Sequence, residues 1–283
     1  MATAAQTRVG PQRRPARTAR PKVSVFTLVI TVLLLLPLVV VAFASLNPDP
    51  YLLFPPERLS LRWFSEAFAY PSFRTSLTLS LRIASIVVAV GLLITVPAAV
   101  ALTRGSRRIQ RTVQLATATP LVTPDILLAL GLLIMLSQLS LSNGLVGLVL
   151  GHVLVGLPIA LQVLVAGLAA VDSDLESAAA TLGASRMRAF ACVTLPSMLP
   201  AIGSAAVFLF IFSFDNVSIS LFLSSPGQTT LPITLFQYLE HNADPTVAAM
   251  STILVIVGIA AALLLGRLGG LGHLAGGAER RRR

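Results

Sequence analysis

Charged residues are scarce in this 283-residue chain, since only 11% of its residues are Asp, Glu, Lys or Arg while 55% are hydrophobic. An ordinary soluble domain carries about 25% charged residues, so the scarcity excludes that class and indicates a protein embedded in a bilayer. The 21 basic residues outnumber the 11 acidic ones. Because they lie mainly outside the apolar runs, we interpret the excess as a topology signal and expect no nucleic-acid partner.

Cysteine and lysine are almost absent as well. The single cysteine, Cys192, cannot form an intrachain disulfide, and no Cys/His cluster has the spacing of a metal site. The single lysine, Lys22, belongs to no Gly-x4-Gly-Lys-Ser/Thr phosphate loop, and neither a His-Glu-x-x-His nor a Gly-x-Ser-x-Gly run occurs. We therefore expect no metal site, no cofactor in this chain and no catalytic residues, so that any ATP hydrolysis belongs to another polypeptide.

Six apolar runs are long enough to cross a bilayer as helices, which takes about 20 residues each. The first is longer than the apolar part of a signal peptide, and we interpret it as an uncleaved span. The sequence thus predicts an all-α, polytopic membrane protein with six transmembrane helices, at Val23–Leu46, Thr75–Leu102, Thr112–Gln138, Gly144–Val171, Leu199–Leu223 and Thr246–Arg267.

The loops between these runs differ in charge. If the N-terminus is cytoplasmic, that side receives the arginines of 104–111, Arg186, Arg188 and the terminal run Arg280–Arg283, whereas the opposite side receives only three arginines. This asymmetry follows the positive-inside rule and places both termini in the cytoplasm. The expected organisation is a basic tail at 1–22, a first transmembrane helix at 23–46, an extracytoplasmic loop at 47–74, a five-helix core at 75–268 and a cytoplasmic tail at 269–283.

A polar segment from Asp172 to Pro196 interrupts the apolar runs on the cytoplasmic side. Ser173 or Asp174 can cap a short helix, and Gly183 suits the left-handed position at which such a helix ends. A second, amphipathic stretch follows it. Periodicity therefore predicts two short helices joined at a glycine, which either dock on a cytoplasmic partner or lie on the membrane surface.

The spacing in this segment resembles the EAA motif of permease subunits in binding-protein-dependent ABC importers, which reads Glu-Ala-Ala, three residues, Gly, nine residues, Ile, one residue, Leu-Pro. The residues that correspond here are Ser177, Ala178, Ala179, Gly183, Val193, Leu195 and Pro196. The resemblance implies a type I ABC importer fold in which a coupling loop at 172–197 docks on the ATPase subunit. Ser177 replaces the family's Glu, so the carboxylate contact is either lost or supplied by the adjacent Glu176.

Other blocks, including Pro120–Asp125, Phe212–Asn216 and Thr230–Pro232, are similar to the second permease of spermidine/putrescine-type importers. The resemblance implies a bacterial inner-membrane permease for a polyamine. Its implied partners are an ATP-binding subunit that uses ATP and Mg, a homologous second permease, a solute-binding protein and the lipid bilayer. Importers of iron, thiamine and sulfate share part of the pattern, so another solute stays open, as do a self-contained secondary transporter and a non-transporting scaffold.

Acidic residues inside the apolar runs are candidates for the translocation path, because a charge at the centre of a membrane helix costs about 2.5–3.5 kcal/mol on insertion scales. We expect the carboxylate of Asp215 to face the path and attract a cationic amine, with Asn216 beside it. Asp125, in the third span, is a further candidate, with pairing to other groups as the alternative.

Three other features have simpler structural interpretations. His152 is read as a buried packing residue rather than a proton relay. Trp63 lies near a membrane boundary, where an anchor at the interface is favoured over a partner contact. Two Gly-x-x-x-Gly pairs predict close helix packing, at Gly147 with Gly151 and at Gly266 with Gly270.

Overall fold

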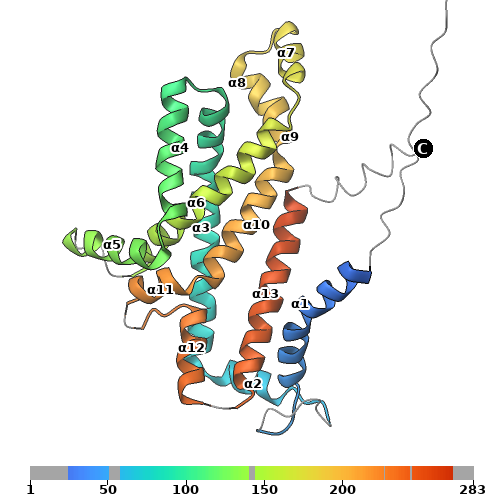
Figure 1. Cartoon of the computed structure of the whole chain (residues 1–283), viewed down its shortest axis with the longest axis vertical. Coiled ribbons are helices and arrows are strands. Elements are labelled where there is room, and N and C mark those ends of the chain that lie inside the picture. The colour runs from blue at the N-terminus through green and yellow to red at the C-terminus, as the bar shows by residue number, and fades with distance from the viewer. Residues whose placement is uncertain (1–24, 51–57, 140–143, 226, 243, 270–283) are drawn as a thin grey trace, which may run out of the picture. The chain divides into compact units, whose positions relative to one another are not determined.

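The computed structural model describes residues 25–50, 58–139, 144–225, 227–242 and 244–269. In these ranges the regular elements are helices, with one isolated bridge that pairs Ser225 with Gln228. The expected all-α class is therefore confirmed. The chain divides into two compact units, residues 1–40 and residues 41–283, and the second contains the helical core (Figure 1).

Among the described residues, four helices are each long and apolar enough to cross a membrane. These are α1 (Val25–Ala44), α3 (Pro71–Arg104), α6 (Leu145–Ala169) and α13 (Thr246–Leu268). The number of crossings becomes five if the pair Arg186–Ser197 and Leu199–Asp215, bent by 63°, is counted as one broken span. Four of the expected spans are thus single helices, while the third and the fifth have a different form.

The third expected span, Thr112–Gln138, is divided between α4 (Arg107–Val122) and α5 (Asp125–Gln138). The chain breaks at Pro124, which has no N–H and disfavours a helical backbone at the residue before it. Figure 1 shows α5 turned sideways from the direction of α4. The prediction of one continuous helix in this region is therefore wrong.

The fifth expected span is also divided, because α10 (Leu199–Asp215) ends at Asn216 and α11 (Val217–Leu223) begins after it. Asn216 has an extended backbone, with φ −72° and ψ 108°, and its Oδ1 accepts a hydrogen bond from the N–H of Ile219 at 2.8 Å. Asparagine favours such caps over helix interiors, because its side chain competes for backbone donors. The break places Asp215 at the last position of α10.

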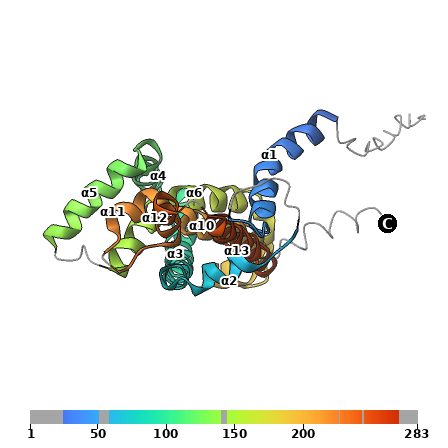
Figure 2. The same ribbon diagram turned by 90° about the horizontal axis from the view of Figure 1, so that it is seen from below.

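Helix α10 lies at the centre of the core, where it packs against α3, α6 and α13 (Figure 2). Its fully buried Leu209 fits between Gly91 of α3 and Gly156 of α6. A Cβ atom at Gly91 would lie 2.8 Å from Leu209 Cδ1, and one at Gly156 would lie 3.0 Å from Leu209 Cδ2. Small residues allow helix backbones to approach closely in membranes, where packing drives association.

The predicted glycine pairs are confirmed in part. Gly151 packs on α11, since a Cβ there would lie 2.5 Å from Leu223 Cδ1. Gly266 is buried in α13, and Gly270 lies outside the described residues. The closest backbone approach at this end of α13 instead joins Gly269 to Gly203 of α10, where an added Cβ on Gly203 would lie 2.5 Å from the Cα of Gly269.

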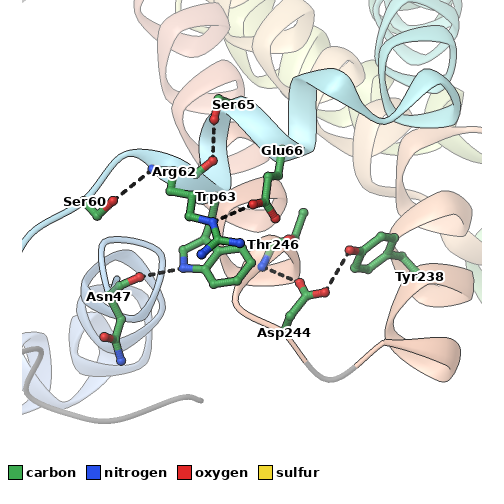
Figure 3. Close-up of polar contacts among 9 residues, drawn as sticks. All are labelled: Asn47, Ser60, Arg62, Trp63, Ser65, Glu66, Tyr238, Asp244 and Thr246. Carbon is green, nitrogen blue, oxygen red and sulfur yellow. Dashed lines mark hydrogen bonds and ion pairs between the residues drawn. The ribbon is translucent and has the colours of Figure 1, made fainter. Parts of the chain in front are cut away.

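At the end of the core opposite to α7 (Ser173–Thr181) and α8 (Arg186–Ala189), the short helix α2 (Arg62–Ala69) packs against α13 (Figures 1 and 3). Trp63 in α2 is only 3% exposed, and its Nε1–H donates to the backbone oxygen of Asn47 at 2.6 Å. The Arg62 guanidinium lies 4.9 Å from the centre of the Trp63 ring and pairs with Glu66 at 2.7 Å. Trp63 is therefore a buried packing residue, and the prediction of an interfacial anchor is wrong.

The same end contains α12 (Leu231–His241), whose Tyr238 hydroxyl donates to Asp244 Oδ2 at 3.1 Å (Figure 3). Asp244 Oδ1 accepts from the N–H of Thr246 at 2.8 Å, where α13 begins. The Tyr238 ring meets the Tyr70 ring edge to face, with centroids 5.3 Å apart. Among its described residues, the predicted loop 47–74 thus contains α2 and the first turn of α3.

Replacing Gly203 with Ala should lower the stability of the purified protein in detergent by about 1–3 kcal/mol, the usual effect of overpacking. The new methyl group would meet backbone atoms of Gly269, which cannot rotate away. Gly258→Ala in α13 is the matched control, because nothing lies within 4 Å of a Cβ there. Thermal unfolding should show a lower midpoint for Gly203→Ala alone. Equal midpoints would contradict this packing of α10 on α13.

Candidate functional site

The coupling segment, residues 172–197, folds as a series of short helices. These are α7 (Ser173–Thr181), α8 (Arg186–Ala189), the π-helical turn η1 (Phe190–Thr194) and α9 (Leu195–Ser197). Asp172 Oδ1 caps α7 by accepting from the N–H of Asp174 at 2.9 Å, so the cap is Asp172 and not the predicted Ser173 or Asp174. Figure 1 shows α7 and α8 together at one end of the core.

Gly183 ends the first of these helices as predicted, with φ +87°. Its N–H donates to the oxygen of Ala180 at 2.9 Å, and the N–H of Ala184 donates to the oxygen of Ala179 at 3.0 Å. Nothing lies within 4 Å of a Cβ placed on Gly183, so space would allow a side chain there. Only the left-handed backbone favours glycine.

The motif residues after Gly183 bring the chain back to α10. Val193 is partly buried in η1, and Leu195 and Pro196 open α9. Pro196 lies in α9, directly after the π-helical turn η1. Ala178 and Ala179 lie in α7, and the Ala178 oxygen accepts from the N–H of Leu182 at 3.1 Å. The motif residues therefore form the turn after α7 and the short helices that lead the chain back to α10.

Two large apolar side chains are largely exposed on the coupling segment, among polar ones. Leu182, which precedes Gly183, is 89% exposed, and Met187 in α8 is 78% exposed. Arg186 and Arg188 are exposed beside them. Met187 belongs to the amphipathic stretch predicted after Gly183, whereas sequence reasoning assigned no coupling role to Leu182, which lies outside that stretch. The sequence signal that could have indicated the exposure of Leu182 is its position directly before Gly183, at the predicted end of a helix.

Glu176 in α7 faces inward. Its Oε1 accepts from Arg104 Nη1 at 2.7 Å and also from the Thr194 hydroxyl. The hydrogen bond from Thr194, followed by the contact with Arg104, lowers the pKa of Glu176 below its ordinary value, while partial desolvation opposes that shift. A lowered folded-state pKa means that this contact stabilises the fold above the ordinary carboxyl pKa. The contribution is lost as the pH falls through the folded-state value.

One face of α10 is open. Its residues line a hollow of about 510 Å³ together with the start of α11: Ser204, Val207, Phe208, Ile211, Phe212, Asp215, Asn216 and Val217. The Phe208 and Phe212 rings stack with centroids 5.9 Å apart, and Asp215, which lines the same hollow, is exposed. Ser204 also lines a second hollow with Asp172 and Leu175 of the coupling segment. The open face thus extends from Asp215 toward the coupling segment.

His152 of α6 contacts both α10 and α11, the two helices on either side of the break at Asn216. It is fully buried, and its Nδ1 lies 3.2 Å from Ser213 Oγ of α10 while its Nε2 lies 3.3 Å from Ser220 Oγ of α11. The Ser220 hydroxyl donates to the Asn216 oxygen at 2.8 Å, so it accepts from His152 at Nε2–H. Nδ1 is then the acceptor for Ser213 in a neutral imidazole.

Comparison with known proteins identifies the family. The family model described as "Binding-protein-dependent transport system inner membrane component" matches residues 91–269. The chain belongs to this family. The putrescine transport system permease protein PotI of Escherichia coli (strain K12) is 31% identical over 219 residues, which cover 74% of this chain and 78% of PotI. The spermidine/putrescine permease PotC of Haemophilus influenzae is 28% identical over 239 residues, covering 84% of this chain and 93% of PotC.

Solved structures show the same fold. A bacterial ABC transporter that imports alginate matches with a TM-score of 0.66 at 14% identity, covering 87% of this chain and 92% of that chain. The inward-facing MetNI methionine transporter matches at 0.62 and 20% identity, covering 73% of this chain and 98% of that chain. The expected type I importer fold and permease function are therefore confirmed, and the protein is a permease subunit of an ABC importer.

The three candidate residues of the translocation path do not all lie together in the structure. Asp215 lines the hollow on α10. Asn216 also lines it, but its side-chain oxygen caps α11. Asp125 lies in the first turn of α5, where a carboxylate is favoured by the helix dipole, and it is not among the described residues around that hollow. The structure thus brings together Asp215 and Asn216, and it does not bring Asp125 to them.

Replacing His152 with Leu should destabilise the permease by about 1–3 kcal/mol, because the buried Ser213 hydroxyl loses its acceptor. His241→Leu is the control, since His241 is an exposed residue at the end of α12. Thermal unfolding in detergent should separate the two variants. A lower midpoint in both, by the same amount, would contradict a specific role for His152 in holding α10 and α11.

Proposed function

We propose that this permease and a homologous second permease enclose a path for a polyamine-like cation, driven by a separate ATPase that docks on the coupling segment. The observation that carries the proposal is the open face of α10. This face presents a carboxylate, at Asp215, beside the stacked rings of Phe208 and Phe212.

Exposure of Asp215 to lipid would be costly, because a charge in the hydrocarbon region is unfavourable by at least about 2.5 kcal/mol. Such a side chain in a membrane protein faces a water-filled cavity or another protein. The opposite side of α10 is already covered by α3, α6 and α13. In a pore between two permeases, the second permease would shield Asp215 from lipid, and the water in the pore would solvate its carboxylate.

The chemistry of this face favours a protonated amine. A carboxylate attracts the ammonium group, and aromatic rings accept both cations and alkyl chains. PotI and PotC are named as putrescine and spermidine/putrescine permeases, which supports the same solute class here. Asp215 would repel an anionic solute. Iron and thiamine remain alternatives within the same machinery, and a secondary transporter would leave the exposed coupling segment without a partner.

We place the coupling segment in the cytoplasm and the end with α2 and α12 outside, facing a solute-binding protein. Arg104 at the end of α3, the first arginines of α4 and the arginines of α8 lie at the same end of the core (Figure 1). The positive-inside rule assigns that end to the cytoplasm, with both termini, in a bacterial inner membrane. The division into tails 1–22 and 269–283, a first span and a core at 75–268 follows the same assignment.

The ATPase would bind the apolar surface around Gly183. Leu182 and Met187 are large hydrophobic side chains with exposures of 89% and 78%, at the end of the core proposed to be cytoplasmic. Burial of these two side chains against a partner would remove their apolar surface from water, which favours docking. ATP and Mg would stay within the partner subunit, and the permease would contribute no catalytic residue.

Replacing Asp215 with Asn should reduce uptake of radiolabelled putrescine by about tenfold at limiting solute, which corresponds to the loss of roughly 1.4 kcal/mol of attraction. Asp215→Glu is the matched control, because it keeps the charge. Both variants are reconstituted with the partner permease, the ATPase and the binding protein. Unchanged uptake by a fully assembled Asp215→Asn complex would contradict the proposed path.

Replacing Gly183 with Val should reduce the amount of ATPase that co-purifies with the permease, because a β-branched residue is strained at φ +87°. Gly183→Asn is the matched control, since asparagine tolerates the left-handed region. We expect the asparagine variant to retain more ATPase than the valine variant. If valine retains as much ATPase as the wild type, the coupling segment is not the docking site.

A further inference from the structure

A cluster of Arg104, Glu176 and Thr194 joins the coupling segment to the core. We propose that Glu176 is a positioning residue that fastens the coupling segment to the end of α3, and that the ATPase is contacted through Leu182 and Met187 without a carboxylate from Glu176. This inference rests on the proposed function and specifies how the docking site is built.

In this cluster, residues from three helical elements meet at one oxygen atom, Glu176 Oε1. Arg104 is the last residue of the 34-residue helix α3, Glu176 lies in the first turn of α7, and Thr194 is the last residue of η1. Glu176 Oε1 accepts from Arg104 Nη1 at 2.7 Å and from the Thr194 hydroxyl. Arg104 and Glu176 are 72 residues apart in sequence, so the contact fixes a tertiary arrangement.

The Glu176 side chain is turned toward Arg104 and Thr194, and it is less exposed than the side chains of the outer surface. Its side chain is 25% exposed, and Thr194 is fully buried, whereas Leu182 is 89% exposed. Ser177, at the motif's Glu position, is exposed and lies one residue further along α7. One residue turns a side chain by about 100° around a helix. The two contacts of Oε1 therefore hold the Glu176 carboxylate toward the core and away from the direction of Leu182.

The cluster also gives the coupling segment a rigid connection to the open face of α10. Arg104 at the C-terminal end of α3 is favoured by the helix dipole, and it is therefore a suitable attachment point for a carboxylate. Helix α3 packs on α10, where Leu209 fits against Gly91. A displacement of α7 by the ATPase would thus be carried by α3 to the helix that holds Asp215.

A double-mutant cycle tests this role. The variants are Glu176→Gln, Arg104→Gln and their combination, with Asp174→Asn and Arg107→Gln as controls that remove an exposed charge from the same two regions. Each variant is studied in the complex with the partner permease, the ATPase and the binding protein. The measurements are the ATPase retained on purification, the putrescine transported per ATP hydrolysed, and the thermal unfolding midpoint of the permease alone.

We expect each single variant of the cluster to keep the ATPase bound but to lower transport per ATP by about two- to fivefold, the range for partly exposed ion pairs. The combined variant should be no worse than either single one, because both remove the same contact. The controls should match the wild type. Exchange of the two charges, with Arg104→Glu and Glu176→Arg together, should restore part of the coupling, since the Thr194 hydroxyl can donate or accept.

Three outcomes would overturn the positioning role. The first is loss of the ATPase both in Glu176→Gln and in its combination with Arg104→Gln. That result would mean that Glu176 contacts the ATPase directly. The second is strict additivity of the two single variants in transport and in unfolding midpoint. The third is an Asp174→Asn effect as large as that of Glu176→Gln. A wild-type complex that holds no ATPase or moves no putrescine would instead refute the proposed function. In that case the unfolding midpoints of the single and combined variants would still test whether Arg104 and Glu176 are coupled.

Discussion

The contact of Leu209 with Gly91 and Gly156 is the constraint on which the described core depends. It allows the central helix α10 to approach α3 and α6 at once, with the two glycines providing the space for one leucine side chain. In a bilayer, lipid tails are as apolar as leucine, so helix association depends on close packing more than on water exclusion. Once α10 is held on this side, its opposite face is the one that stays open.

The break after Asp215 determines what that open face presents. Asn216 caps α11, and His152 holds Ser213 before the break and Ser220 after it. A continuous helix would have carried the chain past Asp215 without these contacts. The cap and the histidine therefore fix the end of α10, and with it the carboxylate at the end of the hollow.

The side chains of the coupling segment point in two directions, outward from the core and inward to it. Gly183 turns the chain between α7 and α8 and leaves Leu182 and Met187 outside. Glu176 points inward to Arg104, which connects the segment to the helix that contacts Leu209. The candidate docking surface and the candidate path are thus linked by packed helices, through a few contacts between residues distant in sequence.

The sequence by itself determined the all-α membrane class, four of the helices, the left-handed turn at Gly183 and the importer family, because each depends on composition, local backbone preference or spacing. It missed the breaks at Pro124 and Asn216, since apolar runs continue through both. Only the tertiary structure decided that Trp63 is buried and that Glu176 pairs with Arg104. Such contacts join residues far apart in the chain, and their geometry follows from how the helices pack.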